Sequence, residues 1–70
     1  MQSIISKRLR DLRYDRQLKQ SDVANSIGCT HQAISNYESG KRVPGISELI
    51  ALANFYNVSI DYLVGRTDSQ

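Results

Sequence analysis

The chain has 70 residues, enough for one small domain, and 40% hydrophobic with 23% charged residues is an ordinary globular composition. A folded chain of this size keeps about 4,400 Å² of surface and buries only about 60% of what it exposes when unfolded. One cysteine and one histidine exclude an intramolecular disulfide and a structural zinc site, so we expect no metal and no cofactor. Since neither an apolar run of membrane-spanning length nor a signal peptide is visible, we expect a cytoplasmic protein without a membrane partner.

The net charge is only +2, but the charges are unevenly distributed along the chain. Residues 1–42 carry eight basic and four acidic side chains, whereas residues 43–70 carry one basic and three acidic side chains. This asymmetry is typical of a protein with one side facing an anion, and equally of an ordinary solvated surface. Charge alone therefore leaves both interpretations open.

Helical spacing of apolar residues predicts the first three elements. Apolar side chains at i, i+4 and i+7 predict a first helix from about Ser3 to Arg16. A second apolar stripe ends at Gly28, which favours the left-handed conformation after a helix. Thr30 is a good N-cap for a third helix from His31 to Ser39, which Gly40 ends.

The second half of the chain predicts a loop and two further helices. Residues 41–45 contain the only proline and form the loop. Apolar residues then predict a helix from Ile46 to about Tyr56, ended by Asn57. Ser59 caps a last helical turn over residues 60–64.

These elements predict an all-α fold, because no segment alternates long enough to form a strand. We expect one compact five-helix domain over residues 1–65. The polar tail, residues 66–70, is expected to fray.

The second and third helices, joined by a glycine turn, have the sequence pattern of a helix-turn-helix. Successive residues of a helix are 100° apart, which places Ile34, Tyr37 and Glu38 on one side of the third helix. The opposite side collects short, uncharged polar side chains: Gln32, Ser35, Asn36 and Ser39, with His31 at the leading end. Such groups can recognise base edges in a major groove, whereas solvated faces usually carry longer charged side chains. Composition alone still leaves a merely hydrophilic surface open.

Several motifs together resemble the Cro and phage-repressor helix-turn-helix family, also called the XRE type. They are Gln20-Ser21-Asp22-Val23-Ala24, Ile27-Gly28, Thr30, Ile34-Ser35-Asn36-Tyr37-Glu38-Ser39-Gly40-Lys41, Pro44, Leu49, Leu52-Ala53 and Val58-Ser59-Ile60-Asp61-Tyr62-Leu63. The resemblance covers residues 5–65. It implies a lambda-repressor-like fold and sequence-specific binding to a double-stranded DNA operator, with residues 30–39 in the major groove. The implied role is a transcriptional repressor or regulator.

The resemblance also implies roles for individual positions. The base-contacting side chains would be His31, Gln32, Ser35 and Asn36. Of these, Gln32 and Asn36 are expected to favour A·T pairs, because a side-chain amide can bond both N6 and N7 of adenine. The residues that meet the DNA phosphates would be Gln20, Thr30, Ser39, Lys41 and Arg42.

Glu38 has a different expected role, because a lone carboxylate beside an apolar face would be costly. In the family, this glutamate pairs with an arginine of the first helix. Arg13 occupies the matching place, so we expect a structural ion pair between Arg13 and Glu38.

Two positions before the helix-turn-helix depart from the family pattern. Lys19 replaces the usual capping residue, and Asp22 in the first turn is expected to offset this in part. Gln17 stands where the family commonly has glycine, so the bend after the first helix is expected to differ.

The C-terminal region is rich in large side chains, namely Tyr56, Ile60, Tyr62 and Leu63. They can close the core, or they can form a two-fold interface between two copies. Because family dimers bind half-sites about 34 Å apart, we expect a homodimer on DNA that pairs through this region.

A second function class remains in view, a helical protein-interaction module of the antitoxin or anti-repressor type. That class would show a large exposed apolar patch and a degraded polar face on the third helix. The polar face is intact in the sequence, which favours DNA. We do not expect an enzyme or a small-molecule ligand, because no phosphate-binding loop or nucleophile–base pair with an orienting partner is present.

Overall fold

The computed structural model describes residues 3–70, which fold into five helices with no strand in that range. The helices are α1 (Ile4–Asp15), α2 (Gln20–Ile27), α3 (His31–Ser39), α4 (Ile46–Tyr56) and α5 (Ile60–Val64). The expected all-α class is confirmed, and the predicted bounds of the first, third, fourth and fifth helices agree to within one residue.

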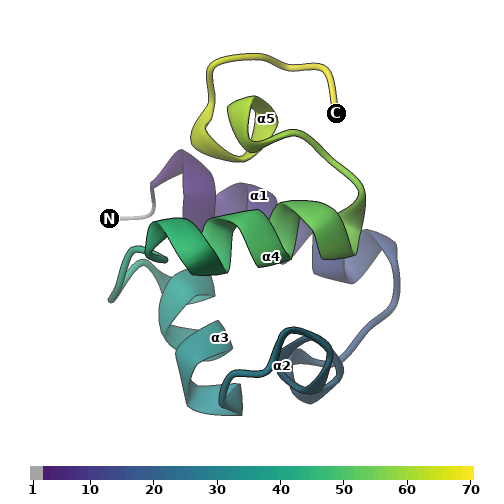
Figure 1. Cartoon of the computed structure of the whole chain (residues 1–70), viewed down its shortest axis with the longest axis vertical. Coiled ribbons are helices and arrows are strands. Elements are labelled where there is room, and N and C mark those ends of the chain that lie inside the picture. The colour runs from purple at the N-terminus through teal and green to yellow at the C-terminus, as the bar shows by residue number, and fades with distance from the viewer. Residues whose placement is uncertain (1–2) are drawn as a thin grey trace.

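The helices are arranged in three groups along the long axis of the molecule. Helices α2 and α3 lie together at one end, and α5 lies at the other end with the C-terminal tail (Figure 1). Helices α1 and α4 lie between them (Figure 1). We call the first region the α2–α3 end, and we call α5 with residues 65–70 the tail end.

Apolar side chains from all five helices meet in one core. The buried residues are Leu9, Leu12, Val23, Ala24, Ile34, Leu49, Leu52, Ala53, Tyr56, Val58 and Leu63. Burying one side chain of this kind stabilises the fold by about 1.5–3 kcal/mol. Helix α3 contributes Ile34, and this contact decides which face of α3 is turned toward solvent.

Two local features fix the start of α3. Gly28 takes the left-handed conformation at φ 76° and ends α2, as predicted. Glycine suits this position because a residue with a side chain would be strained there. The hydroxyl oxygen of Thr30 then accepts a hydrogen bond from the backbone N–H of Ala33 at 3.0 Å. Because α2 is stopped and α3 is capped within three residues, only a short turn separates the two helices.

The start of α2 is capped without help from the side chain of Lys19. The carboxylate of Asp22 instead accepts a hydrogen bond from the backbone N–H of Lys19 at 2.9 Å. An acidic side chain in the first helical turn also complements the helix dipole. Asp22 therefore offsets the missing cap, in agreement with the sequence prediction.

The turn between α1 and α2 contains a strained residue. Gln17 adopts φ 56°, a conformation that favours glycine and costs other residues about 1–2 kcal/mol. The backbone N–H of Leu18 bonds the carbonyl of Arg13 at 3.1 Å and closes the turn. The conformation preferred by glycine is thus present here although the residue is glutamine.

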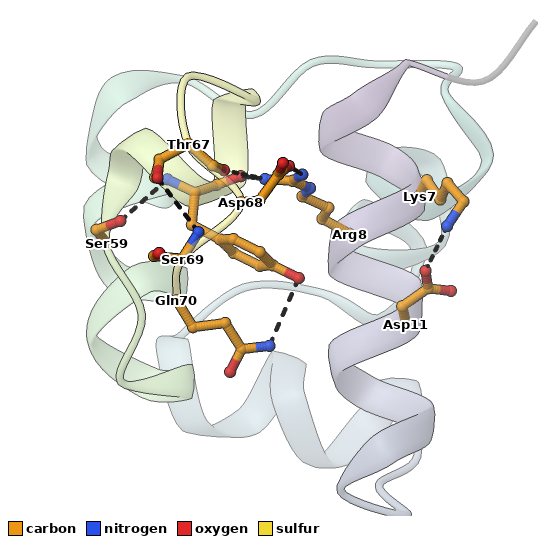
Figure 2. A network of polar contacts seen from close by, with 9 residues as sticks. Lys7, Arg8, Asp11, Ser59, Thr67, Asp68, Ser69 and Gln70 are labelled. Carbon is orange, nitrogen blue, oxygen red and sulfur yellow. Dashed lines mark hydrogen bonds and ion pairs between the residues drawn. The ribbon is translucent and has the colours of Figure 1, made fainter.

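The C-terminal tail is not frayed, contrary to the prediction. The guanidinium of Arg8 in α1 donates to the backbone carbonyls of Tyr62 and Thr67, and to Asp68 at 2.9 Å (Figure 2). The backbone N–H of Ser59 donates to the carbonyl of Gln70 at 3.0 Å. Fraying was predicted because residues 66–70 are polar. A polar sequence does not reveal that its partner lies 60 residues earlier in the chain.

Arg8 also stacks on an aromatic ring at the tail end. Its guanidinium carbon lies 4.2 Å from the ring centroid of Tyr62. Such a cation–π contact adds on the order of 1 kcal/mol. One arginine therefore joins α1, α5 and the tail.

The described part of the chain offers neither a membrane span nor a metal cluster. No helix within residues 3–70 is both long and apolar enough to cross a bilayer. Among those same residues, no three metal-ligating side chains gather at one place.

Candidate nucleic-acid interface

The two faces of α3 separate as the sequence predicts. Ile34 and Glu38 are buried and Tyr37 is half-buried. Among the candidate base-contacting residues, His31 and Gln32 are exposed, and Ser35 and Asn36 are partly exposed. The outward face of α3 therefore carries amide, hydroxyl and imidazole groups without a charged side chain.

Two of these side chains are joined to each other. The amide nitrogen of Gln32 donates to the side-chain oxygen of Asn36 at 3.1 Å, one helical turn along α3. This bond uses one donor of Gln32 and one acceptor site of Asn36. The amide oxygen of Gln32 and both amide hydrogens of Asn36 remain available for base edges.

Behind the outward face, Arg13 and Glu38 form the ion pair that the resemblance implied. The guanidinium of Arg13 donates from Nε to Oε2 at 2.8 Å and from Nη2 to Oε1 at 2.9 Å. Its third nitrogen, Nη1, donates to the carbonyl of Leu18 at 2.9 Å. Both side chains are buried, and the hydrogen bonds to Glu38 raise the pKa of Arg13. The pair ties α1 to α3 and to the turn before α2.

The network continues outward through Gln20 at the first position of α2. The amide nitrogen of Gln20 donates to Oε1 of Glu38 at 3.2 Å. The amide oxygen of Gln20 lies 2.8 Å from Nε2 of His31. A continuous chain of polar contacts thus runs from the buried arginine to the N-terminal end of α3.

The candidate phosphate-contacting residues differ in how their polar atoms are used. The oxygen of Thr30 accepts the cap bond, which leaves its hydroxyl hydrogen available to donate. The hydroxyl of Ser39 donates to the carbonyl of Asn36 at 3.2 Å, so it must rotate before it can donate to a phosphate. Lys41 and Arg42 are both exposed in the turn after α3.

A hollow beside α3 contains residues that the sequence analysis missed. It is lined by Arg10, Arg13, Tyr14, Gln20, Ser35, Glu38 and Ser39. Arg10 and Tyr14 come from α1 and stand next to candidate contacts from α2 and α3. Arg10 lies three residues before Arg13 and therefore on the same side of α1. That spacing could have identified Arg10 as a cation at this surface.

Two ionisable side chains, one just before α3 and one within it, are uncharged at neutral pH. Burial raises the pKa of the Cys29 thiol and of the Tyr37 hydroxyl above their ordinary values. Neither side chain therefore adds a negative charge near the outward face at neutral pH.

The C-terminal side chains proposed to pair two copies are mostly used in the core. Tyr56 is 1% exposed and Leu63 is 0% exposed, so neither can contact a second molecule. Ile60 and Tyr62 are half-buried against the core. Apolar surface is instead exposed after α3, where Val43 and Ile46 are each 68% exposed and Ile50 is 45% exposed.

Known proteins share both the sequence pattern and the fold. A helix-turn-helix family model matches residues 7–63. The chain is 38% identical over 66 residues to the cryptic phage CTXphi transcriptional repressor RstR of Vibrio cholerae, covering 94% of this chain and 60% of that protein. It is 36% identical over 64 residues to the HTH-type transcriptional regulator ImmR of Bacillus subtilis, covering 91% of this chain and 50% of that protein. The chain thus spans about half the length of the curated relatives it matches.

Solved structures agree with these matches. The P22 c2 repressor in complex with a synthetic operator superposes with a TM-score of 0.84 at 28% identity, covering 91% of this chain and 96% of that one. A transcriptional regulator from Listeria innocua gives a TM-score of 0.84 at 32% identity, covering 93% of this chain and 61% of that one. The family model, the curated relatives and the shared fold together show that the chain belongs to the XRE-type helix-turn-helix family of DNA-binding transcriptional regulators.

Proposed function

We propose that the chain binds a double-stranded DNA operator by placing α3 in the major groove, and that it acts as a transcriptional repressor. The observation that supports this most is the outward face of α3, which carries hydrogen-bonding groups without charge while the opposite face is buried. A repressor–operator complex with the same fold adds independent support. On this proposal the protein acts in the cytoplasm, where the operator DNA lies.

The base contacts are assigned to His31, Gln32, Ser35 and Asn36. Because Gln32 and Asn36 are joined, they would recognise adjacent base pairs as one unit, with adenine the expected partner. Replacing one amide then disturbs the contact of the other. Their contributions to specificity should therefore not be additive.

The phosphate contacts are assigned to Gln20, Thr30, Ser39, Lys41 and Arg42, and we add Arg10. Lys41 and Arg42 follow α3 directly and would supply the salt-dependent part of the affinity. Gln20 begins α2, where backbone N–H groups and the helix dipole favour an anion. Together these groups would hold the register of α3 in the groove.

We propose further that two copies bind one operator. The folded chain measures 28 × 25 × 23 Å, and half-sites of this kind lie about 34 Å apart, so neighbouring copies come within reach of each other's side chains. Ile46 and Ile50 lie one turn apart on the same face of α4, and Val43 precedes them in the loop that follows the phosphate-contacting turn. These three residues, the apolar patch, are a better contact surface than the largely buried C-terminal region.

The patch is small, because a stable interface uses about 20–30 residues from each partner. We therefore expect a monomer in free solution and a pair on DNA, where the operator supplies a high effective concentration. Ile46→Glu should abolish cooperative binding to a two-half-site duplex and leave binding to one half-site unchanged. Ser47→Glu, an exposed neighbour on α4, is the control and should keep cooperativity. Equal loss of cooperativity in both variants would refute the patch.

The first test of the function is a binding selection on randomised duplex DNA at one near-physiological salt concentration. An enriched inverted repeat with half-sites one turn apart supports an operator-binding pair. One enriched half-site supports DNA recognition and contradicts pairing. Salt-sensitive binding without any enrichment would contradict the proposal and favour the protein-interaction module.

Two variants separate base contacts from phosphate contacts. Gln32→Ala should weaken binding to the best site by about 1–3 kcal/mol and relax base preference at one or two positions. Lys41→Ala should weaken binding to all sequences alike and reduce the slope of log affinity against log salt by about one. A uniform loss for Gln32→Ala would contradict the assigned base-contacting face.

A further inference from the structure

The imidazole of His31 is held at one nitrogen by a chain of groups whose donor and acceptor roles are fixed. Arg13 can only donate, and both oxygens of the Glu38 carboxylate accept its hydrogen bonds. The same Glu38 Oε1 lies 3.2 Å from the side-chain amide of Gln20. A carboxylate oxygen accepts only, so Gln20 must turn its NH₂ group toward Glu38.

The orientation of Gln20 decides the state of His31. With the NH₂ group directed at Glu38, the amide oxygen of Gln20 faces Nε2 of His31 at 2.8 Å. An amide oxygen can only accept, so Nε2 must carry the hydrogen in this contact. In a neutral imidazole the other nitrogen, Nδ1, then has a lone pair and no hydrogen.

We propose that His31 presents Nδ1 as a hydrogen-bond acceptor and selects a base that offers a donor in the major groove, namely adenine through N6 or cytosine through N4. Guanine offers only acceptors at this edge, and thymine offers an acceptor and a methyl group, so both are disfavoured. A phosphate is disfavoured for the same reason, because its oxygens also accept. Gln20 is the positioning residue of this selection, and it acts through His31.

The inference rests on the proposed placement of α3 in the major groove, but its first half can be tested without DNA. In the ¹⁵N-labelled free protein at pH 8, long-range ¹H–¹⁵N spectra report which imidazole nitrogen carries the hydrogen. We expect the hydrogen on Nε2 of His31. In Gln20→Met, which removes the acceptor and keeps a flexible side chain of similar length, the two tautomers should exchange. A hydrogen on Nδ1 in the wild-type protein would overturn the proposal and leave DNA binding intact.

The second half is tested with duplexes that differ only at the base pair contacted by His31. The wild-type protein should prefer adenine or cytosine over guanine and thymine by about tenfold, as one well-placed contact allows. His31→Arg, which only donates, should shift the preference toward guanine. Gln20→Met should reduce the discrimination between the duplexes, a ratio that a uniform loss of affinity does not change.

Lys41→Ala is the matched control, because it should lower affinity for all four duplexes and keep their ratio. Circular dichroism verifies that each variant is folded. Equal affinity of the wild-type protein for all four duplexes would overturn the base assignment of His31. Failure to bind any duplex would instead contradict the proposed function itself.

Discussion

The two ends of the molecule are each held by a largely buried arginine of α1, and the carboxylates that the two arginines bond lie in opposite surroundings. At the α2–α3 end, Arg13 forms a bidentate pair with Glu38, whose side chain is 5% exposed. At the tail end, Arg8 bonds Asp68, whose side chain is fully exposed, and two backbone carbonyls. Both guanidinium groups also lie over a tyrosine ring, Tyr14 for Arg13 and Tyr62 for Arg8.

This difference in carboxylate exposure changes how much each ion pair contributes to stability. The buried pair is costly to break, because a charge left without its partner cannot return to water. It also supports Gln20 and His31, so the structural ion pair shares one network with groups that we propose contact DNA. The pair of Arg8 with Asp68 contributes little by itself, since the carboxylate is fully exposed and water and salt screen it. At the tail end the backbone carbonyls are the more important partners of Arg8.

The largest expected effect comes from breaking the buried pair. Glu38→Ala should lower the free energy of unfolding by about 3–5 kcal/mol, because Arg13 is left buried and uncompensated. A domain of this size has a total stability of about 4–10 kcal/mol, so this variant is at the edge of unfolding. Urea denaturation followed by circular dichroism measures the loss. The double variant Arg13→Met with Glu38→Leu should lose less than Glu38→Ala, and a larger loss would contradict this account.

Alkaline pH should lower the free energy of unfolding through Tyr56, a residue of the core between the two ends. Burial raises the pKa of Tyr56 to about 12, above its ordinary value of about 10. The fold therefore favours the protonated hydroxyl, so the stability from this group is complete below pH 10. It is lost as the pH rises from 10 to 12, and the loss is about 3 kcal/mol. Tyr56→Phe should reduce the alkaline loss, because only the smaller contributions of other buried groups remain, whereas Tyr14→Phe, at an exposed ring, should retain it in full. A similar alkaline loss in Tyr56→Phe would refute the assignment.

Breaking the contacts of Arg8 should lower the free energy of unfolding moderately and loosen the tail end. Arg8→Ala removes two bonds to backbone carbonyls and the stacking on Tyr62, and should cost about 1–2 kcal/mol. It should also speed hydrogen exchange at Ser59 and Arg66, whose N–H groups bond the tail and α5. Asp68→Asn should leave stability unchanged, because that carboxylate is fully exposed. If Asp68→Asn were as harmful as Arg8→Ala, the carbonyl contacts would not be the main ones.

The α2–α3 end was easier to predict from sequence than the tail end. Periodicity and caps gave the bounds of α3, since both depend on residues within one or two turns. The pairing of Arg13 with Glu38 came from the family resemblance. Arg8 had no such guide, because its partners lie more than 50 residues away and are mostly backbone atoms. Local patterns carry no information about contacts of that kind.

The orientation of side chains within the site likewise could not be predicted from the sequence. Wheel geometry placed Gln32 and Asn36 on one face, but it did not show that they bond each other. Gln20 and His31 were assigned separate DNA contacts, and only the structure brings them together. Such contacts depend on the angle between α2 and α3, which is a property of the packed core.

The smallest expected change in stability concerns two turns, one after α1 and one after α4. Gln17 and Asn57 both adopt φ 56°, but asparagine tolerates this conformation far better than glutamine. Gln17→Gly should therefore raise the free energy of unfolding by up to about 1 kcal/mol, after the greater flexibility of unfolded glycine is subtracted. In a domain of this size that corresponds to a rise in Tm of about 4–8 °C at most. Asn57→Gly is the matched control and should change Tm by much less. A lower Tm for Gln17→Gly would show that the glutamine side chain makes a compensating contact at the entrance to the helix-turn-helix.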